Sequence, residues 1–505
     1  MRRERALLIN SGASLIYRIV AIIYGLLIPR LILATFGSAA NGTISSVSQF
    51  INITFLVEGG FLNAARVEFY GPVSNKDWSS VSTVYKSFSR VFRGFSAIFL
   101  IYVIILALLY PLFVETPFSY YDAILLVLIL GVGSIFESLL GVTPQIMLFA
   151  DQKGYINTTA QIVCTILNAI VSVVLIELGC SIIIVKFFVA IIFLLRPIFL
   201  FIYVRKFYPI DKNALFNKHV LSQSGAAFTK SLAFYVHKNT DTLVITMFLN
   251  VSWVSVYSVH NYVVSNISNL VSSILGNTEA VFGQMIAREE KKAIENEVPV
   301  YDLLSKILSV IFFTTTIILI SQFVRVYTVG VTDIDYYQPV FAVLLCCGEM
   351  VYCMSLTYNN MIMGAGHIKQ TQWISIVEAA INIVLSIVLV IFYGLIGVAI
   401  GTLVAFIFNS VANIIYMRKH IYKMSLWFII KSYLVNIVAS VASILIFWFL
   451  VNYQIQNFLD FFLYAAIVFV FVILITCLIN AVCFRKYIKP LCHKLRSKLI
   501  RKHRN

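Results

Sequence analysis

The sequence contains few charged residues. Asp, Glu, Lys and Arg make up only 12% of its 505 residues, whereas 60% are hydrophobic. A soluble domain typically has about 25% charged residues, and its core does not need so much apolar surface. The shortage of charge therefore excludes a soluble protein. It predicts helices that cross a lipid bilayer, each about 20 residues long.

The motifs of common enzyme sites are also missing. There is no phosphate-binding G-x-x-x-x-G-K-[ST] sequence, and neither His-Glu-x-x-His nor Gly-x-Ser-x-Gly occurs. Asp333-Ile334-Asp335 resembles a glycosyltransferase acidic pair but lies in a short predicted loop with no domain around it, and Cys346-Cys347 lacks metal-ligand spacing. We therefore expect no enzyme activity, no catalytic residues, no metal site and no bound cofactor.

Long apolar segments, by contrast, are abundant. They predict an all-α integral membrane protein with about 14 transmembrane helices. The predicted spans are 10–33, 41–65, 88–112, 121–150, 155–177, 181–204, 221–248, 251–275, 301–323, 336–363, 371–392, 395–417, 428–451 and 458–482.

Basic residues outnumber acidic ones, 38 to 22, so the formal net charge is +16. When both termini are placed in the cytoplasm, most Lys and Arg residues fall on the cytoplasmic side, as the positive-inside rule requires. We therefore predict a multi-pass protein of the cytoplasmic (inner) membrane with both termini in the cytoplasm. The basic tail at 485–505 suits an anionic lipid surface better than a nucleic acid.

The chain repeats part of its pattern at an offset of about 214 residues. Ser11–Ser14 is echoed by Ser224–Ala227, and Ala160–Ser172 by Ile374–Ser386. Such repeats are typical of secondary transporters, whose substrate site lies where the repeats meet. The predicted domains are an N-lobe of helices 1–6 (1–210), a C-lobe of helices 7–12 (211–425), helices 13–14 (426–484) and a basic cytoplasmic tail (485–505).

Charged side chains inside the spans are candidate functional residues, because each costs about 2.5–3.5 kcal/mol on insertion scales. Predicted helix 7 carries Lys230, His237, Lys238 and Asp241, and His260 lies at a similar depth in helix 8. Helical spacing places Lys230, His237 and Asp241 on one face. We predict a cationic, substrate-binding cavity suited to phosphate or pyrophosphate. Packing between lobes, with snorkelling lysines, is the alternative.

Four further charged residues complete the candidate site. Arg18 in helix 1 and Glu58 in helix 2 reach similar depths, so they can form a pair at the cavity or a purely structural bridge. Glu349 and Glu378 are candidate coupling carboxylates for Na⁺ or H⁺, because a buried Glu can hold a proton. Hydrogen bonding between packed helices is the alternative role for both.

Several short motifs resemble the polysaccharide flippases of the MOP (multidrug/oligosaccharidyl-lipid/polysaccharide) exporter superfamily. They are Asn10-Ser11-Gly12, Pro29-Arg30-Leu31, Phe36-Gly37-Ser38, Asn41-Gly42, Glu58-Gly59-Gly60, Tyr70-Gly71-Pro72 and Gly364-Ala365-Gly366-His367. The resemblance implies two parallel six-helix lobes around a central cavity, with helices 13 and 14 packed outside. Family members typically line this cavity with basic residues, which Arg18, Lys230, His237 and Lys238 match.

The resemblance also implies a function. The cargo would be an undecaprenyl-pyrophosphate-linked oligosaccharide, moved from the inner to the outer leaflet of a bacterial cytoplasmic membrane by alternating access. The product could be capsule, teichoic-type polymer or O-antigen. Expected partners are the lipid-linked glycan, membrane lipids, a glycan polymerase and assembly proteins, but no nucleic acid.

Three alternatives remain open at the level of sequence. A cation-coupled multidrug antiporter of the same superfamily would use Asp241, Glu349 and Glu378, although the basic excess argues against it. A lipid II flippase would differ only in its cargo. A membrane-embedded glycan polymerase or acyltransferase would need a catalytic constellation that the sequence does not show.

Overall fold

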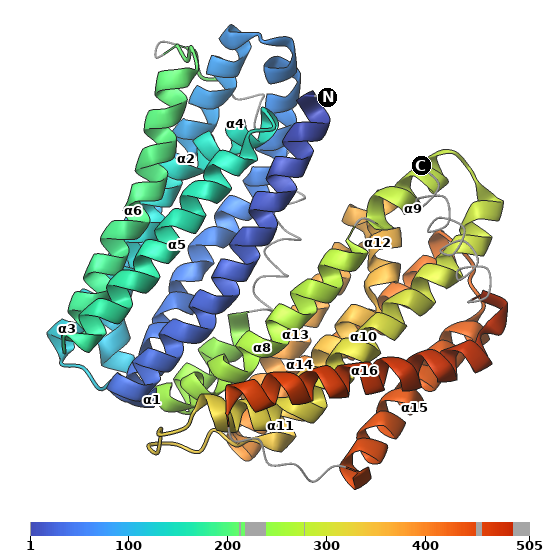
Figure 1. Cartoon of the computed structure of the whole chain (residues 1–505). Coiled ribbons are helices and arrows are strands. Elements are labelled where there is room, and N and C mark those ends of the chain that lie inside the picture. The colour runs from blue at the N-terminus through green and yellow to red at the C-terminus, as the bar shows by residue number, and fades with distance from the viewer. Residues whose placement is uncertain (1, 212–213, 218–238, 277, 451–456, 488–505) are drawn as a thin grey trace. The chain divides into compact units, whose positions relative to one another are not determined.

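The computed structural model describes residues 2–211, 214–217, 239–276, 278–450 and 457–487, with the backbone alone at 2–8, 53–64 and 448–450. Every regular element of these residues is helical (Figure 1). The helices are α1 (Arg2–Asn75), α2 (Trp78–Phe113), α3 (Tyr120–Phe136), the π-helix η1 (Glu137–Gly141), α4 (Val142–Ala150), α5 (Gly154–Glu177), α6 (Ile182–Phe207), α8 (Val251–Leu275), α9 (Thr278–Ala287), α10 (Lys291–Tyr327), α11 (Pro339–Met354), α12 (Leu356–Gly364), α13 (Ile368–Tyr393), α14 (Leu395–His420), α15 (Leu426–Leu450) and α16 (Phe458–Cys483).

Eleven helical segments among the described residues are long and apolar enough to cross a membrane. The expected class, an all-helical multi-pass membrane protein, is therefore confirmed. The count of 14 stays a prediction. Helix α1 contains the first two predicted spans, and α8 matches the eighth without being one of the eleven. The seventh predicted span, 221–248, lies largely outside the described residues.

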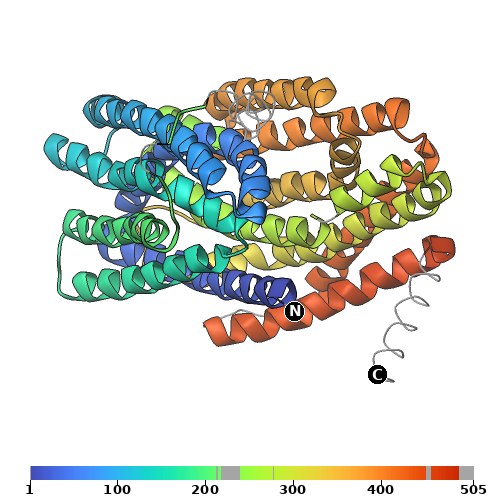
Figure 2. The ribbon, with the colours of Figure 1, turned by 90° about the horizontal axis from the view of Figure 1, so that it is seen from above.

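The chain separates by its internal contacts into two compact units. Unit 1 consists of Met1–Ser258 and Gly330–Ile334, and unit 2 of Val259–Val329 and Asp335–Asn505. In unit 1, α2, α3, α5 and α6 run alongside one another as a bundle, in blue to green in Figures 1 and 2. Unit 2 has separate cores of its own, one of them around Phe282, Tyr358 and Met417.

A sharp bend divides α1 into two arms. Gly37 at the bend has φ 81° and ψ 175°, a combination that is essentially restricted to glycine. The second arm begins with Ser38, whose backbone N–H and hydroxyl both donate to Asp333, at 2.6 and 2.7 Å. A carboxylate at the start of a helix satisfies backbone donors and suits the helix dipole. Asp333 therefore has a structural role: it anchors the segment Gly330–Ile334 to the second arm of α1.

Several of the described helices expose many large apolar side chains, as helices that face lipid do. Helix α16 exposes large apolar side chains such as Leu459 and Leu478 and buries Thr476 and Asn480. Asn480 and Asn436 of α15 exchange amide hydrogen bonds at 3.2 and 3.3 Å. Lipid is as apolar as leucine, so association of membrane helices depends on close packing and hydrogen bonds between buried polar groups.

Candidate functional site

Most of the residues predicted to line the cationic cavity lie outside the part of the chain that the structure describes. Lys230, His237 and Lys238 lie outside the described residues, as does the side chain of Glu58. Arg18 has an exposed side chain on the first arm of α1, beside an open surface pocket of about 430 Å³. The grouping of these residues into one site stays a prediction.

The two other predicted residues of this group are deeply buried. Asp241 lies in the helical segment 239–248 of unit 1, is 4% exposed and accepts a hydrogen bond of 3.2 Å from the hydroxyl of Tyr257. His260 belongs to unit 2, where its ring meets Phe341 edge to face with centroids 5.3 Å apart. Each side chain thus has a packing partner within its own unit.

Glu349 and Glu378 each join two helices of unit 2. Glu349 on α11 accepts a hydrogen bond of 2.6 Å from the hydroxyl of Ser268 on α8. Glu378 on α13 accepts one from the side-chain amide of Asn409 on α14. Both carboxylates are buried. The structure thus contains the helix-packing contacts that were the alternative, while the coupling role stays a prediction.

A polar network in unit 1 centres on Arg196 of α6. Its guanidinium donates to Glu137 and Gln145, both at 3.2 Å, and to Asn157 at 3.0 Å. The side chains of Arg196 and Glu137 are only 17% and 14% exposed. Because a helix inside a bilayer has no water to solvate a charge, the ion pair and its amide partners stabilise both charges.

Local backbone geometry makes room for the Glu137 carboxylate. Glu137 begins the π-helix η1, a wider turn that interrupts the α-helical ladder between α3 and α4. A Cβ atom on Gly141, at the end of this turn, would lie 2.7 Å from the carboxyl carbon of Glu137. Glycine at this position therefore leaves the space in which the carboxylate faces Arg196.

Removing either charge of this pair is expected to have unequal effects. Arg196→Met leaves the carboxylate of Glu137 buried without its cation, so the free energy of unfolding should fall by about 1–3 kcal/mol. Glu137→Gln should lower it less, because the amide oxygen still accepts from Arg196, which keeps Gln145 and Asn157. SDS titration in mixed micelles measures both values. Equal losses of stability in the two variants would contradict the larger cost expected for a buried carboxylate without its cation.

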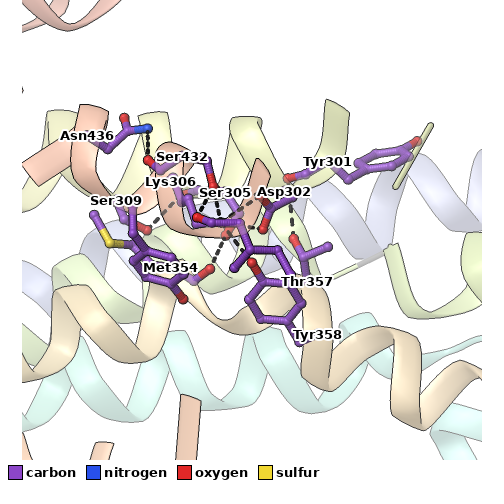
Figure 3. A network of polar contacts seen from close by, with 12 residues as sticks. Tyr301, Asp302, Ser305, Lys306, Ser309, Met354, Thr357, Tyr358, Ser432 and Asn436 are labelled. Carbon is purple, nitrogen blue, oxygen red and sulfur yellow. Dashed lines mark hydrogen bonds and ion pairs between the residues drawn. The ribbon is translucent and has the colours of Figure 1, made fainter. Parts of the chain in front are cut away.

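A second charged cluster lies in unit 2 and is completely buried. Asp302 and Lys306, one helical turn apart on α10, are both 0% exposed. The Lys306 ammonium donates to both carboxylate oxygens of Asp302 at 2.6 Å. It also donates to the hydroxyls of Tyr358 on α12 and Ser432 on α15, both at 2.8 Å (Figure 3).

The Lys306 cluster is saturated by its own partners. An ammonium group has three N–H donors, and Asp302, Tyr358 and Ser432 accept all three. The ring of Tyr433 lies 4.2 Å from Nζ and adds a cation–π contact. Since no donor remains for a ligand, the cluster connects α10, α12 and α15 rather than binding a cargo. The sequence analysis did not predict this cluster, although opposite charges four residues apart in an apolar span could have indicated it.

The chain resembles solved transporter structures in fold. No family model and no curated protein sequence matches it. A structure of the lipid II flippase MurJ in an inward closed conformation matches 95% of this chain and 100% of its own, with a TM-score of 0.70 and 18% identity.

Two multidrug transporters of the MATE type also match. An inward-facing member of the MOP superfamily covers 79% of this chain and 94% of its own, with a TM-score of 0.61 and 14% identity. The transporter DinF-BH covers 83% and 97%, with a TM-score of 0.61 and 16% identity. At these identities the comparisons establish the fold, which is the transporter fold that the resemblance to MOP exporters led us to expect.

Proposed function

We propose that this chain is a flippase for undecaprenyl-pyrophosphate-linked oligosaccharide, working by alternating access between the leaflets of a bacterial cytoplasmic membrane for surface polysaccharide synthesis. The match to a lipid II flippase over 95% of this chain carries the proposal, because the two drug transporters cover only 79% and 83% of it. No enzymatic step is needed, since the reaction breaks no covalent bond.

The chemistry of the cargo fits the charge of the chain. Net charge is +16, and a pyrophosphate is recognised by Arg and Lys through charge-assisted hydrogen bonds. Arg18, Lys230, His237, Lys238 and His260 are the proposed contacts. The polyprenyl tail stays in lipid. Asp241, Glu349 and Glu378 are proposed to support the site or bind a coupling Na⁺ or H⁺, and Glu58 to pair with Arg18.

Two other cargoes have support of their own. Lipid II is favoured by the similarity to the MurJ structure, which is named as that of a lipid II flippase. A cationic drug is favoured by the two multidrug structures and by the buried carboxylates Asp241, Glu349 and Glu378. The basic excess over the whole chain argues against the drug.

Deleting the gene in its own host and assaying two glycan pools tests the cargo. We expect surface polysaccharide to disappear while lipid-linked oligosaccharide accumulates in the cytoplasmic leaflet. Arg18→Ala and Lys238→Ala should each restore export at least about ten-fold less well than wild type, the effect of one lost charged contact. Lys206→Ala, an exposed position at the end of α6, is the matched control and should restore export fully.

The other outcomes of this experiment are equally informative. Accumulation of lipid II would show that the cargo is lipid II and not the oligosaccharide. Normal glycan with altered drug sensitivity would make the chain an antiporter. Full export by both well-expressed Arg18 and Lys238 variants would refute the assignment of the cationic residues while leaving the cargo in place.

A further inference from the structure

Unit 1 contains a cavity of about 570 Å³ that has no part in the function proposed above. Its walls come from α1, α3, η1, α4 and α6. Lys186, Arg196 and Glu137 line it, together with the hydroxyl-bearing side chains of Tyr24, Ser48 and Ser134. All of these residues belong to unit 1. The volume falls in the range of small-molecule sites and is far larger than a single ion requires.

Lys186 is the unusual member of this wall. It is the fifth residue of α6 and only 9% exposed, so its ammonium does not snorkel to the surface. Among the described residues, Lys186 makes no hydrogen bond or ion pair, whereas Arg196 on the same helix has three partners. The nearby N-terminal end of α6 is the positive end of the helix dipole. A buried cation placed there calls for a negative partner.

The other described residues of the wall supply hydrogen-bond donors and no unpaired negative charge. Glu137 is already paired with Arg196, so Lys186 adds one net positive charge to the described wall. In the described part of the chain, the hydroxyls of Tyr24, Ser48 and Ser134 also make no hydrogen bond, so they can donate to a ligand. In a low-dielectric surrounding, such a wall attracts an anion.

We propose that this cavity binds a phosphate group, with Lys186 as the charged contact and the Tyr24, Ser48 and Ser134 hydroxyls as additional donors. A phosphate offers several strong acceptor oxygens, which match an ammonium and several hydroxyls better than a monatomic anion does. The group can belong to free inorganic phosphate or to a lipid headgroup. The proposal goes beyond the flippase function, because the cargo contacts proposed above are different residues.

Binding of radiolabelled inorganic phosphate to the full-length chain, purified in a phosphate-free maltoside detergent, tests the site. Lys186→Met should weaken binding at least about ten-fold, since a charged hydrogen bond is lost. Lys186→Arg should stay within a few-fold of wild type, and Tyr24→Phe should fall between them. Lys206→Met is the matched control, the same substitution on the same helix at an exposed position outside the cavity.

Native mass spectrometry of the same variants identifies the source of the phosphate. A phosphorylated lipid retained by wild type and Lys206→Met but lost from Lys186→Met supports a headgroup, whereas phosphate binding without such a lipid supports the free anion. The proposal is overturned if wild type binds neither free phosphate nor a phosphorylated lipid, or if Lys186→Met binds as well as wild type.

Loss of a buried charge should not unfold Lys186→Met. If this variant does unfold, Tyr24→Phe gives an independent test of the site. Neither result depends on which cargo is exported.

Discussion

Asp302→Ala is expected to lower the free energy of unfolding of unit 2 by about 3–5 kcal/mol, because it leaves a fully buried ammonium without its counter-charge. Tyr358 and Ser432 still accept from Lys306, but two neutral hydroxyls do not replace a carboxylate that meets Nζ with both oxygens. SDS titration in mixed micelles, followed by far-UV circular dichroism, measures the loss.

A double variant separates the unpaired charge from the lost volume. Asp302→Leu combined with Lys306→Met removes both charges and keeps the space filled, so stability should return to or exceed that of wild type. Lys291→Met, an exposed position on the same helix, is the control for the lysine substitution and should change little. If the double variant is as unstable as Asp302→Ala, the cluster does not act through an unpaired charge.

Gly42→Ala is expected to destabilise unit 1 by at least about 3 kcal/mol, the upper part of the range for overpacking. Gly42 lies on the second arm of α1, where an added Cβ would come within 1.6 Å of the carbonyl oxygen of Val251 in α8. That obstacle is backbone, so no side chain can rotate away. The hydrogen bond of 2.8 Å between Asn41 and Ser255 holds the two helices together at this point.

Gly94→Ala is the matched control for Gly42→Ala. Gly94 is an exposed glycine inside α2, and an added Cβ there has no atom within 4 Å. Alanine in a helix interior is favoured over glycine by roughly 0.5–1 kcal/mol, so this variant should match or exceed wild type in the same titration. Equal behaviour of the two alanine variants would contradict a contact between α1 and α8 at Gly42.

Individual polar residues show what sequence reasoning singled out and what it missed. Sequence reasoning treated charged residues inside the predicted spans as candidates and so singled out Glu349 and Glu378. In the structure both are buried and hydrogen-bonded to neighbouring helices. The same reasoning passed over Asp302 and Lys306, although their spacing of four residues was visible. It did not single out Lys186, since burial beside a cavity leaves no mark on the local sequence pattern.

Sequence alone determined the class of this protein. Whether a segment enters a bilayer depends on its average polarity over about 20 residues, and composition is sufficient to establish that. Tertiary structure alone decided the partners of the buried charges. Arg196 meets Glu137 across 59 residues of chain, and Lys306 meets Ser432 across 126. Such pairs depend on how helices pack, and helices of similar apolar composition can pack in many ways until side-chain shape and hydrogen bonding select one arrangement.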